Sequence, residues 1–216
     1  MDPYYLTCIL FALCGYLLGS IPFGHIIGKK VAAVDVMDLG SGNIGATNVA
    51  RELGLTYGAL TLALDICKGF LPLCVFRLIF PEHDLSLAAL AICPFLGHQY
   101  SIFLRFHGGK GVATAFGVLL ALSPFSACLL LMLFLLIVAV TDYISLGSII
   151  SASAMPVFLI LFKKPLPWCG AAVVIAFLIW LRHRDNLGRL IRGEERKWRN
   201  RDHARRSNRR PSSSSE

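Results

Sequence analysis

The stretch SGNIGATNVAR, which ends at Arg51, combines small, hydroxyl and amide side chains with two glycines. Glycines allow a backbone to approach a ligand closely, and successive N–H groups in such a loop can form a concave site for an anion. Thr47 and Asn48 add side-chain donors, and Arg51 adds a planar cation suited to two hydrogen bonds with one phosphate. A plain connection between helices is the alternative, but the low apolar content and the closing arginine favour phosphate binding.

A second stretch, LGHQYSIFLRFHGGKGVAT, places Lys110 between glycines just before an apolar run. The exposed amides and positive dipole of a helix start, together with an ammonium group, suit a phosphate. The stretch differs from a nucleotide-binding P-loop, because Leu104 stands where that motif has a glycine and Gly111 where it has Ser or Thr. A nucleotide triphosphatase is therefore disfavoured, and an anchoring role for Lys110 at a membrane surface is the plainer alternative.

A third stretch, LRHRDNLGRLIRGEE, begins at Leu181, directly after an apolar run. Basic residues in such a position commonly orient a membrane helix. His183 and Asn186 are less easily explained in that way, since residues three apart share one face of a helix. We expect these two side chains to serve a binding site.

Other polar residues lie inside or at the start of apolar runs. Asp65 and Lys68 are one helical turn apart, and charged residues within a membrane usually pair or line a polar cavity. We expect them to support the site from within the membrane. Ser145 and Ser148 begin a further apolar run, and the sequence does not choose between them. His98 taken alone is more typical of a packed polar residue than of a ligand.

Long apolar runs must position these motifs, because 56% of the 216 residues are hydrophobic and only 16% are charged. A soluble protein has about a quarter charged residues, and a membrane helix needs about twenty apolar residues. The sequence predicts an all-α integral membrane protein with about seven transmembrane helices. They lie near 4–27, 56–80, 85–104, 112–123, 125–141, 147–162 and 166–181. The fourth is short for a full crossing, and Pro124 follows it directly.

The distribution of Lys and Arg predicts the orientation in the membrane. Seven crossings place the basic residues of the polar loops on the side of the C-terminal tail, whereas Lys163 and Lys164 lie on the other side. We therefore expect the N-terminus outside and the C-terminus in the cytoplasm. Residues 1–197 are predicted to form a single transmembrane domain, and 198–216 a basic, Ser/Arg-rich, disordered tail. The tail suits anionic lipid headgroups, and because no recognition fold precedes it we expect no nucleic-acid partner.

Several kinds of chemistry lack their sequence signatures. The chain contains neither the GxSxG of serine hydrolases nor the HxxxxD of the common soluble-type glycerolipid acyltransferases. Its seven cysteines lie singly in apolar runs, without the Cys/His spacing of a metal site. We therefore expect no metal and no cofactor, and a site that works by binding phosphate groups and positioning them.

Taken together, these motifs resemble those of the bacterial acyl-phosphate:glycerol-3-phosphate acyltransferase family. SGNIGATNVAR is similar to its first motif, GH…F.GGKGVAT to its second and HR.N…R…GEE to its third, in that order. The DICKG that begins at Asp65 and the GSIPFG that begins at Gly19 also fit, so the resemblance covers residues 15–195 or so. The Arg/Ser-rich extension after Lys197 goes beyond the family pattern.

The resemblance implies a seven-helix enzyme of the bacterial cytoplasmic membrane, with its active site facing the cytoplasm. Such an enzyme transfers an acyl group from acyl phosphate to the 1-hydroxyl of glycerol 3-phosphate, giving lysophosphatidic acid and phosphate, the first step of phospholipid synthesis. A soluble enzyme that makes acyl phosphate would be a further partner. By the same resemblance, the expected catalytic residues are Arg51, Lys110, His183 and Asn186, and the expected substrate-binding residues are Ser41, Gly42, Asn43, Thr47, Asn48, Gly109 and Ser148.

Within this scheme the first motif holds the phosphoryl group of acyl phosphate, and glycerol 3-phosphate contacts Arg51, Ser148 and residues of the other two motifs. The hydroxyl proton can pass to the leaving phosphate or to His183, and the sequence leaves this open. A transporter of a phosphorylated metabolite is the main alternative function, and a membrane scaffold is a lesser one. Against the transporter, the polar motifs collect on one side of the membrane, whereas a permeation path needs them throughout.

Overall fold

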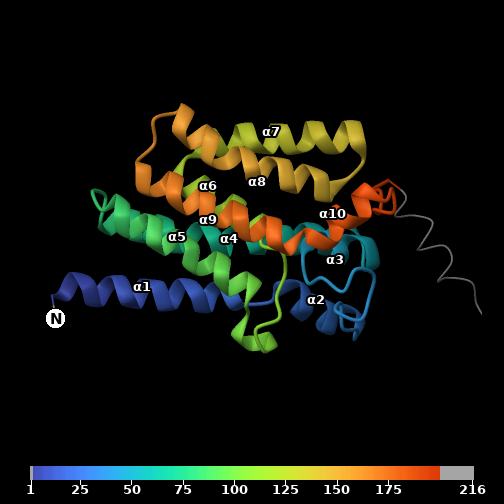
Figure 1. Ribbon diagram of the computed structural model, residues 1–216. Coiled ribbons are helices and arrows are strands. Elements are labelled where there is room, and N and C mark those ends of the chain that lie inside the picture. Colours follow the sequence, from blue (N-terminus) through green and yellow to red (C-terminus); the bar gives the residue numbers. More distant parts are fainter. Residues whose placement is uncertain (1, 200–216) are drawn as a thin grey trace, which may run out of the picture.

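The computed structural model describes residues 2–199, which fold into helices. The longer helices are α1 (Pro3–Ser20), α4 (Leu55–Ile79), α5 (Asp84–Gln99), α7 (Pro124–Thr141), α8 (Ile144–Leu161) and α9 (Leu166–Arg182). The shorter ones are α2 (Phe23–Ala32), α3 (Ala46–Glu52), α6 (Val112–Leu122), α10 (Arg184–Ile191) and the 3-10 helix η1 (Ile102–Leu104). Figure 1 shows the long helices running along a common direction, with α2, α3 and α10 at the end away from the N-terminus.

Within residues 2–199, five helical stretches are long and apolar enough to cross a membrane. A sixth is added if α9 and α10, which are bent by 58° at their junction, form one span. Helix α6 has 11 residues and reaches about 17 Å, little more than half of a hydrocarbon layer of about 30 Å. The prediction of an all-helical fold is confirmed, and each of the seven predicted segments contains a helix.

Two of the predicted helices end earlier than expected. The first breaks where Ile21 precedes Pro22, because the residue before a proline disfavours the helical conformation. The third ends at Gln99, and the chain turns there through η1. The backbone carbonyl groups freed at these two breaks accept hydrogen bonds from Lys68 and Arg182, respectively. The breaks therefore supply polar groups inside an otherwise apolar bundle.

Small residues allow two pairs of helices to pack closely. A Cβ atom on Gly19 of α1 would overlap the backbone of Pro94 in α5, and a Cβ atom on Gly117 of α6 would overlap the backbone of Ile66 in α4. Packing at this distance replaces the hydrophobic driving force that membrane helices lack. The two contacts hold α1 against α5 and α6 against α4, and so fix the frame around the loop before α6.

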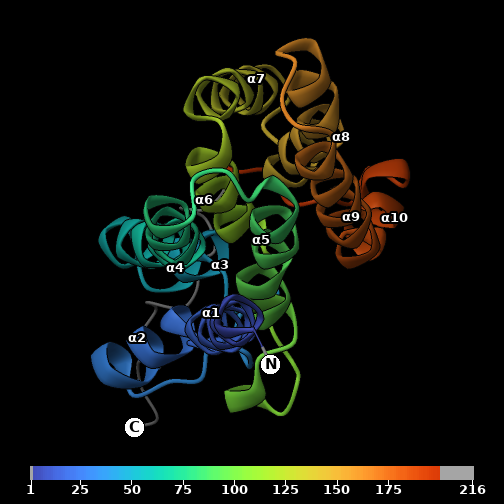
Figure 2. The same ribbon diagram turned by 90° about the vertical axis from the view of Figure 1, so that its left-hand side faces the viewer.

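Helix α6 lies in the middle of the bundle, as Figure 2 shows in a view along the long helices. It packs against α4, α5, α7 and α9. Helix α1 lies beside α5 on one side, and α8 lies beside α7 and α9 on the other. The core between them is filled by large buried side chains, including Phe76, Phe95, Leu119, Leu159 and Ile175. Because α6 is short and central, the loop before it is surrounded by longer helices.

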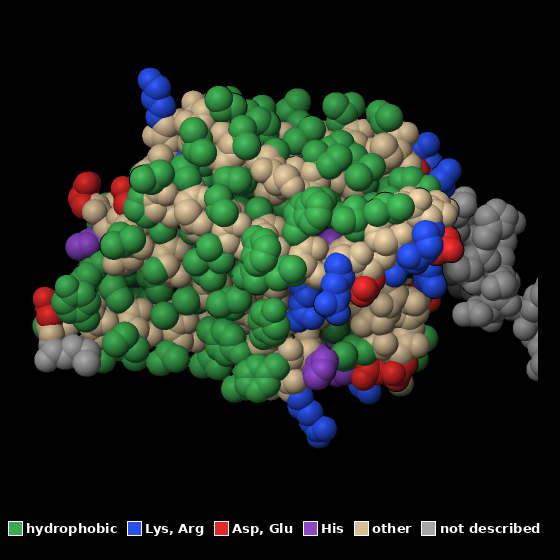
Figure 3. Space-filling model, viewed as in Figure 1, with side chains coloured by type: hydrophobic (Ala, Val, Ile, Leu, Met, Phe, Trp, Pro, Cys, Tyr) green, Lys and Arg blue, Asp and Glu red, His purple; other side chains and the backbone are tan. Residues whose placement is uncertain are grey.

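The outer surface of the long helices is apolar. Large hydrophobic side chains are exposed on α1, α4, α7 and α9, among them Leu13, Leu71, Leu135 and Phe177. Figure 3 shows hydrophobic side chains along the length of the molecule, with many of the Lys and Arg side chains in view toward the end that carries α2 and α10. This distribution suits lipid along the helices and water at their ends.

The chain turns back after α10 at Gly193, whose φ of +71° favours glycine. The amide of Trp198 donates a hydrogen bond to the carbonyl of Asp142 at 2.8 Å, and Nε of Arg199 lies 3.7 Å from the Asp142 carboxylate. The first two residues of the tail predicted at 198–216 therefore pack against the loop between α7 and α8. The remainder of that tail lies outside the described residues.

Candidate active site

A cavity of about 620 Å³ lies inside the bundle and is lined by two sets of side chains. The polar set includes Ser41, Asn43, Thr47, Asn48, Arg51, Asp65, His98, Lys110, Ser145, Ser148, Ser151, His183, Asn186, Arg189, Glu195 and Arg196. The apolar set contains Leu62, Ile66, Phe116, Leu119, Leu130, Leu131, Phe134, Met155 and Ile179. A ligand with an anionic head and a hydrocarbon chain can satisfy both sets.

Asn48 organises the loop of the first motif. Its side-chain oxygen accepts a hydrogen bond from the amide of Ser41 at 2.9 Å, and its side-chain nitrogen donates to the carbonyls of Val36 and Leu39 at 3.0 and 3.1 Å. Gly42 has a φ of +68°, and its amide donates to the carbonyl of Leu39 at 2.9 Å. These hydrogen bonds within the protein show that Asn48 and Gly42 shape the loop beside the cavity.

Arg51 and Asn43 present further polar groups of the first motif. Oδ1 of Asn43 accepts from the amide of Gly45 at 2.8 Å, which leaves its side-chain nitrogen as a donor. The Arg51 guanidinium donates to the carbonyl of Arg196 at 3.1 Å and lies 6.0 Å from the centre of the Trp198 ring. Burial lowers the pKa of Arg51, and the charge of Arg196 acts in the same direction. The segment after α10 thus fixes a cation at the edge of the cavity.

The GGKG loop rests on the C-terminal end of α5. The amide of Gly109 donates to the carbonyl of His98 at 3.1 Å, and the side-chain amide of Gln99 donates to the carbonyl of Lys110 at 3.1 Å. The amide of Gly109 is therefore engaged within the protein. Gly109 was predicted to bind substrate, and it lies outside the cavity lining. Lys110 does line the cavity, and its ammonium group donates a hydrogen bond to the side-chain oxygen of Asn186.

The bend between α9 and α10 places the third motif. His183 at the bend and Asn186 in α10 both line the cavity. The side-chain nitrogen of Asn186 donates to Oε1 of Glu195 at 2.6 Å, and Nε of Arg189 donates to Oε2 of the same carboxylate at 2.8 Å. These contacts form a chain from Lys110 through Asn186 and Glu195 to Arg189, which fixes the lysine relative to α10.

Lys110 has an unusual acidity for a lysine. Burial lowers its pKa to about 8, and the charges of Arg189 and Arg51 act in the same direction, against the opposing charge of Glu195. The ammonium group is therefore protonated at neutral pH, as phosphate binding requires. It loses its charge as the pH rises through about 8.

His183 is neutral at physiological pH. Burial lowers its pKa to about 4, and the charge of Lys110 acts in the same direction. Nδ1 lies 2.9 Å from the carbonyl oxygen of Ile179, which can only accept a hydrogen bond, so Nδ1 carries the proton. The other ring nitrogen, Nε2, is left as an acceptor. His183 can therefore hold a substrate hydroxyl, although its low pKa makes it a weak base.

Glu195 and Arg189 were not singled out by the sequence analysis. Burial raises the pKa of Glu195, but the hydrogen bonds from Asn186 and Arg189 oppose that effect, and the net shift is downward. The carboxylate is thus charged beside Lys110 at neutral pH. The one sequence signal was the GEE of the third motif, which does not reveal that the chain turns back over α10.

Ser145 and Ser148 both line the cavity from the start of α8. The hydroxyl of Ser148 donates to the carbonyl of Ile144 at 2.9 Å, and its oxygen can still accept. Nine of the eleven predicted site residues come together here: Ser41, Asn43, Thr47, Asn48, Arg51, Lys110, Ser148, His183 and Asn186. Gly42 and Gly109 are the two outside the lining.

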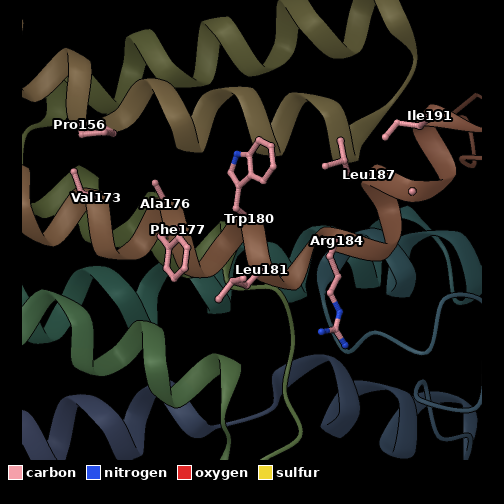
Figure 4. Close-up of a pocket in the computed structure, with 10 residues that line it drawn as sticks. Pro156, Val173, Ala176, Phe177, Trp180, Leu181, Arg184, Leu187 and Ile191 are labelled. Carbon is pink, nitrogen blue, oxygen red and sulfur yellow. The ribbon is translucent and has the colours of Figure 1, made fainter.

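Another hollow, of about 760 Å³, lies on the outside of α9 and α10. Figure 4 shows Trp180 pointing toward α8, whereas Phe177, Leu181 and Arg184 point to the other side of α9. Among the described residues, Arg184 is the one charged side chain in its lining. Because no group of polar side chains converges there, this surface hollow does not match the phosphate-binding motifs. The inner cavity is the candidate active site.

Comparison with known proteins identifies the family. The sequence model of the glycerol-3-phosphate acyltransferase family matches residues 9–193. The chain belongs to this family. The glycerol-3-phosphate acyltransferase of Geobacter sulfurreducens is 46% identical over 190 residues, which cover 88% of this chain and 97% of that relative. The corresponding protein of Trichlorobacter lovleyi is 47% identical over 196 residues, with coverage of 89% and 99%.

Two solved structures share the fold of this acyltransferase. One is the glycerol 3-phosphate form of PlsY (YgiH), an integral membrane glycerol 3-phosphate acyltransferase, with a TM-score of 0.85 and 41% identity. The other is the lysophosphatidic acid form of PlsY, with a TM-score of 0.83 and 40% identity. Each comparison covers 88% of this chain and 95% of the other.

The acyltransferase is therefore an integral membrane enzyme with several crossings, as predicted, and it acts on glycerol 3-phosphate. Acylation of that alcohol gives lysophosphatidic acid, the precursor of phospholipids. The transporter and scaffold alternatives have no support in these comparisons.

Proposed function

We propose that the acyltransferase takes its acyl group from acyl phosphate and transfers it to the 1-hydroxyl of glycerol 3-phosphate, releasing inorganic phosphate. The observation that carries this proposal is a cavity in which cations and amides adjoin an apolar lining. An acyl phosphate has a phosphate group next to a hydrocarbon chain, and both parts find matching walls there. The resemblance of the three motifs to enzymes that use this donor also supports it.

The polar lining offers separate donors for two phosphate groups. We assign the phosphoryl group of the donor to Ser41, Asn43 and Thr47 in the first motif, on the loop that Asn48 and Gly42 shape. We assign glycerol 3-phosphate to Arg51, Lys110, Ser148, His183 and Asn186. The apolar set, which includes Phe116, Leu131 and Phe134, would then hold the first part of the acyl chain.

Such a site needs no metal or cofactor, because acyl phosphate is a mixed anhydride whose carbonyl is already activated. The enzyme has to align the attacking hydroxyl with that carbonyl and stabilise charge on the departing phosphate. Orientation can lower a barrier by about 7–11 kcal/mol in favourable systems. Fixed cations and N–H donors such as Arg51 and Lys110 contribute further where charge develops.

We further propose that the leaving phosphate accepts the proton of the attacking hydroxyl. His183 is the rival base, but its pKa of about 4 makes it a poor acceptor of a full proton. Its unprotonated Nε2 suits a hydrogen bond with a hydroxyl group of glycerol 3-phosphate. His183 then positions the substrate, and the phosphate completes the proton transfer as it leaves.

Replacing His183 by alanine distinguishes the two roles. Loss of one hydrogen bond is expected to raise the KM for glycerol 3-phosphate about tenfold while kcat changes about threefold or less. Steady-state phosphate release at saturating and subsaturating glycerol 3-phosphate gives both constants. A fall in kcat of about a hundredfold or more would instead make His183 the general base.

The proposed donor is tested with the purified enzyme in detergent or lipid. Palmitoyl phosphate and glycerol 3-phosphate are supplied without metal or nucleotide, and phosphate release is followed together with formation of the lysolipid. Equal amounts of the two products support the proposal. Acylation that proceeds with a palmitoyl thioester but not with palmitoyl phosphate would overturn the donor while leaving the family activity intact.

We also propose that the chain crosses the membrane seven times, with the N-terminus outside and the active site facing the cytoplasm. The short α6 would then be a crossing inside the protein, surrounded by α4, α5, α7 and α9. The positive side chains near α2 and α10 support this orientation. A site on the cytoplasmic side of the bacterial inner membrane would receive acyl phosphate from a soluble enzyme that makes it.

Labelling of introduced cysteines tests this orientation. In a variant without the native cysteines, Lys163→Cys is expected to react with a membrane-impermeant maleimide in intact cells, because it lies in the loop between α8 and α9. Arg192→Cys, at the end of α10, is expected to react only after lysis. The reverse pattern would invert the proposed topology.

A further inference from the structure

Three ionisable side chains lie buried beside the cavity and have no part in the mechanism above. Nζ of Lys68 is 2.8 Å from Oδ1 of Asp65, and Nδ1 of His98 is 3.6 Å from the same oxygen. All three are at most 5% exposed. Burying charges inside a membrane protein is costly even when they are paired, so such groups are expected to serve a function.

The imidazole of His98 lies directly against the GGKG loop. A Cβ atom on Gly109 would overlap Nε2 of His98, and a Cβ atom on Gly108 would overlap its backbone carbonyl. The amide of Gly109 donates to that carbonyl at 3.1 Å. The loop is therefore supported by both the ring and the backbone of one residue, and only glycines can approach it so closely.

Asp65 and Lys68, on the neighbouring helix α4, lie beside the His98 ring. Lys68 also donates to the carbonyl of Ile21 at 2.9 Å, at the break between α1 and α2. The Asp65 carboxylate faces Nδ1 of His98, so it favours the tautomer that carries its proton on that nitrogen. The ring is thus held between a carboxylate on one side and Gly109 on the other.

Asp65 and His98 also belong to the cavity lining. His98 contacts Gly109, the residue directly before the lysine whose ammonium group faces the cavity. Lys110 follows Gly109, and its ammonium group reaches Asn186. A shift of the loop toward or away from His98 would therefore move the ammonium group relative to α10.

We propose that Asp65 and His98 are positioning residues. Asp65 orients the imidazole, and contact with the imidazole fixes the position of the backbone at Gly109 and Lys110. The lysine side chain is thereby placed to bind the phosphate of glycerol 3-phosphate. The inference rests on the assignment of Lys110 to that phosphate in the proposed function. It does not depend on the identity of the acyl donor.

A double-mutant cycle on the ring and the glycine tests the contact. The measurement is the affinity for glycerol 3-phosphate in titration calorimetry, which requires no acyl donor. Gly109→Ala is expected to weaken binding about tenfold or more, because the new methyl group displaces the loop from the ring. In the His98→Ala background the same change is expected to weaken binding about threefold or less, since the ring is gone.

The side-chain amide of glutamine can reach the place of Nε2, which provides a conservative control. His98→Ala is expected to weaken binding about tenfold, and His98→Gln to restore it to within about threefold of the wild type. If His98 only fills space in the core, its replacement would lower the stability of the protein without changing the affinity for glycerol 3-phosphate. Size-exclusion profiles and the Tm are therefore measured alongside, and His98→Gln keeps the test possible if the alanine variant does not fold.

Equal losses from Gly109→Ala in both backgrounds, or unchanged affinity in His98→Ala, would overturn the proposal. If the wild type binds glycerol 3-phosphate but releases no phosphate from palmitoyl phosphate, the proposed donor fails and the cycle still gives its answer. If Lys110→Ala binds glycerol 3-phosphate as the wild type does, the assignment of the lysine fails, and the proposal with it.

Discussion

Replacing Lys110 by alanine is expected to reduce kcat/KM for glycerol 3-phosphate about 100- to 1,000-fold. The ammonium group is the cation of the GGKG loop, it lines the cavity, and it is held by Asn186. In this partly dry site it binds the substrate phosphate and stabilises the charge that develops during transfer. Phosphate release from palmitoyl phosphate at varied glycerol 3-phosphate measures the effect.

Lys164→Ala is the matched control, because this lysine lies in the loop between α8 and α9, outside the cavity lining. It is expected to leave kcat/KM within about twofold of the wild type. A Lys110→Ala variant that is folded and retains activity within about fivefold of the wild type would remove the lysine from the site.

The lowered pKa of Lys110 adds a pH dependence to this prediction. The ammonium group is charged below its pKa of about 8 and neutral above it. The KM for glycerol 3-phosphate is therefore expected to rise about tenfold for each pH unit above that value. In Lys110→Arg the guanidinium stays protonated, so the residual activity of this variant is expected to lack the rise. A wild-type KM that stays constant between pH 7 and pH 10, from about one unit below the pKa to about two units above it, would contradict the charge requirement.

Apolar runs predicted the bounds of four helices closely. The predicted segments 56–80, 112–123, 125–141 and 166–181 differ from α4, α6, α7 and α9 by at most one residue at each end. Proline at the first or second position of α7 and α9 marks their starts, since it fits the first turn of a helix. Hydropathy was sufficient for these four, including α6, which lies inside the bundle.

The first and third helices were predicted too long because apolar residues continue past their ends. Pro22 is a local signal for the first break, and the prediction overlooked it. The turn after Gln99 lacks such a signal, because Ile102 and Phe103 are as apolar as a helix would require. Its conformation depends on tertiary contacts, including the hydrogen bond from Arg182 to the Gln99 carbonyl.

The sequence predicted which residues gather at the site better than it predicted what each one does. Polar residue types at motif spacing were sufficient to select Lys110, His183 and the first motif. Whether a donor faces the cavity or the loop depends on backbone conformation, as with Asn48, whose side chain is fully engaged within the loop. Spacing along the chain carries no information on that choice.

Glu195 is a residue of the site that the sequence analysis did not single out, again because its role depends on backbone conformation. Its carboxylate reaches Asn186 only because the chain reverses at Gly193, where φ is +71°. The sequence contains the glycine and two adjacent glutamates, and nothing in their order tells which glutamate enters the site. The structure distinguishes them clearly: the side chain of Glu195 is 6% exposed, and that of Glu194 is 59% exposed.

This pair of neighbours provides the second large expected effect. Glu195→Ala is expected to lower kcat/KM for glycerol 3-phosphate about a hundredfold, whereas Glu194→Ala is expected to change it about twofold or less. The first change removes the acceptor of both the buried Asn186 and the partly exposed Arg189 and leaves their donors unpaired next to Lys110. The second removes only an exposed ion pair with Arg192.

Glu195→Gln separates geometry from charge. The amide oxygen of glutamine can still accept the hydrogen bond from Asn186, but its NH₂ group cannot accept the one from Arg189. An activity loss of about tenfold, between those of the wild type and Glu195→Ala, would indicate that alignment of Asn186 accounts for part of the effect. Equal losses in the two Glu195 variants would assign the effect to the charge and its pair with Arg189. If Glu195→Ala and Glu194→Ala behave alike, the carboxylate does not organise the site, and the chain of contacts from Lys110 to Arg189 has no catalytic role.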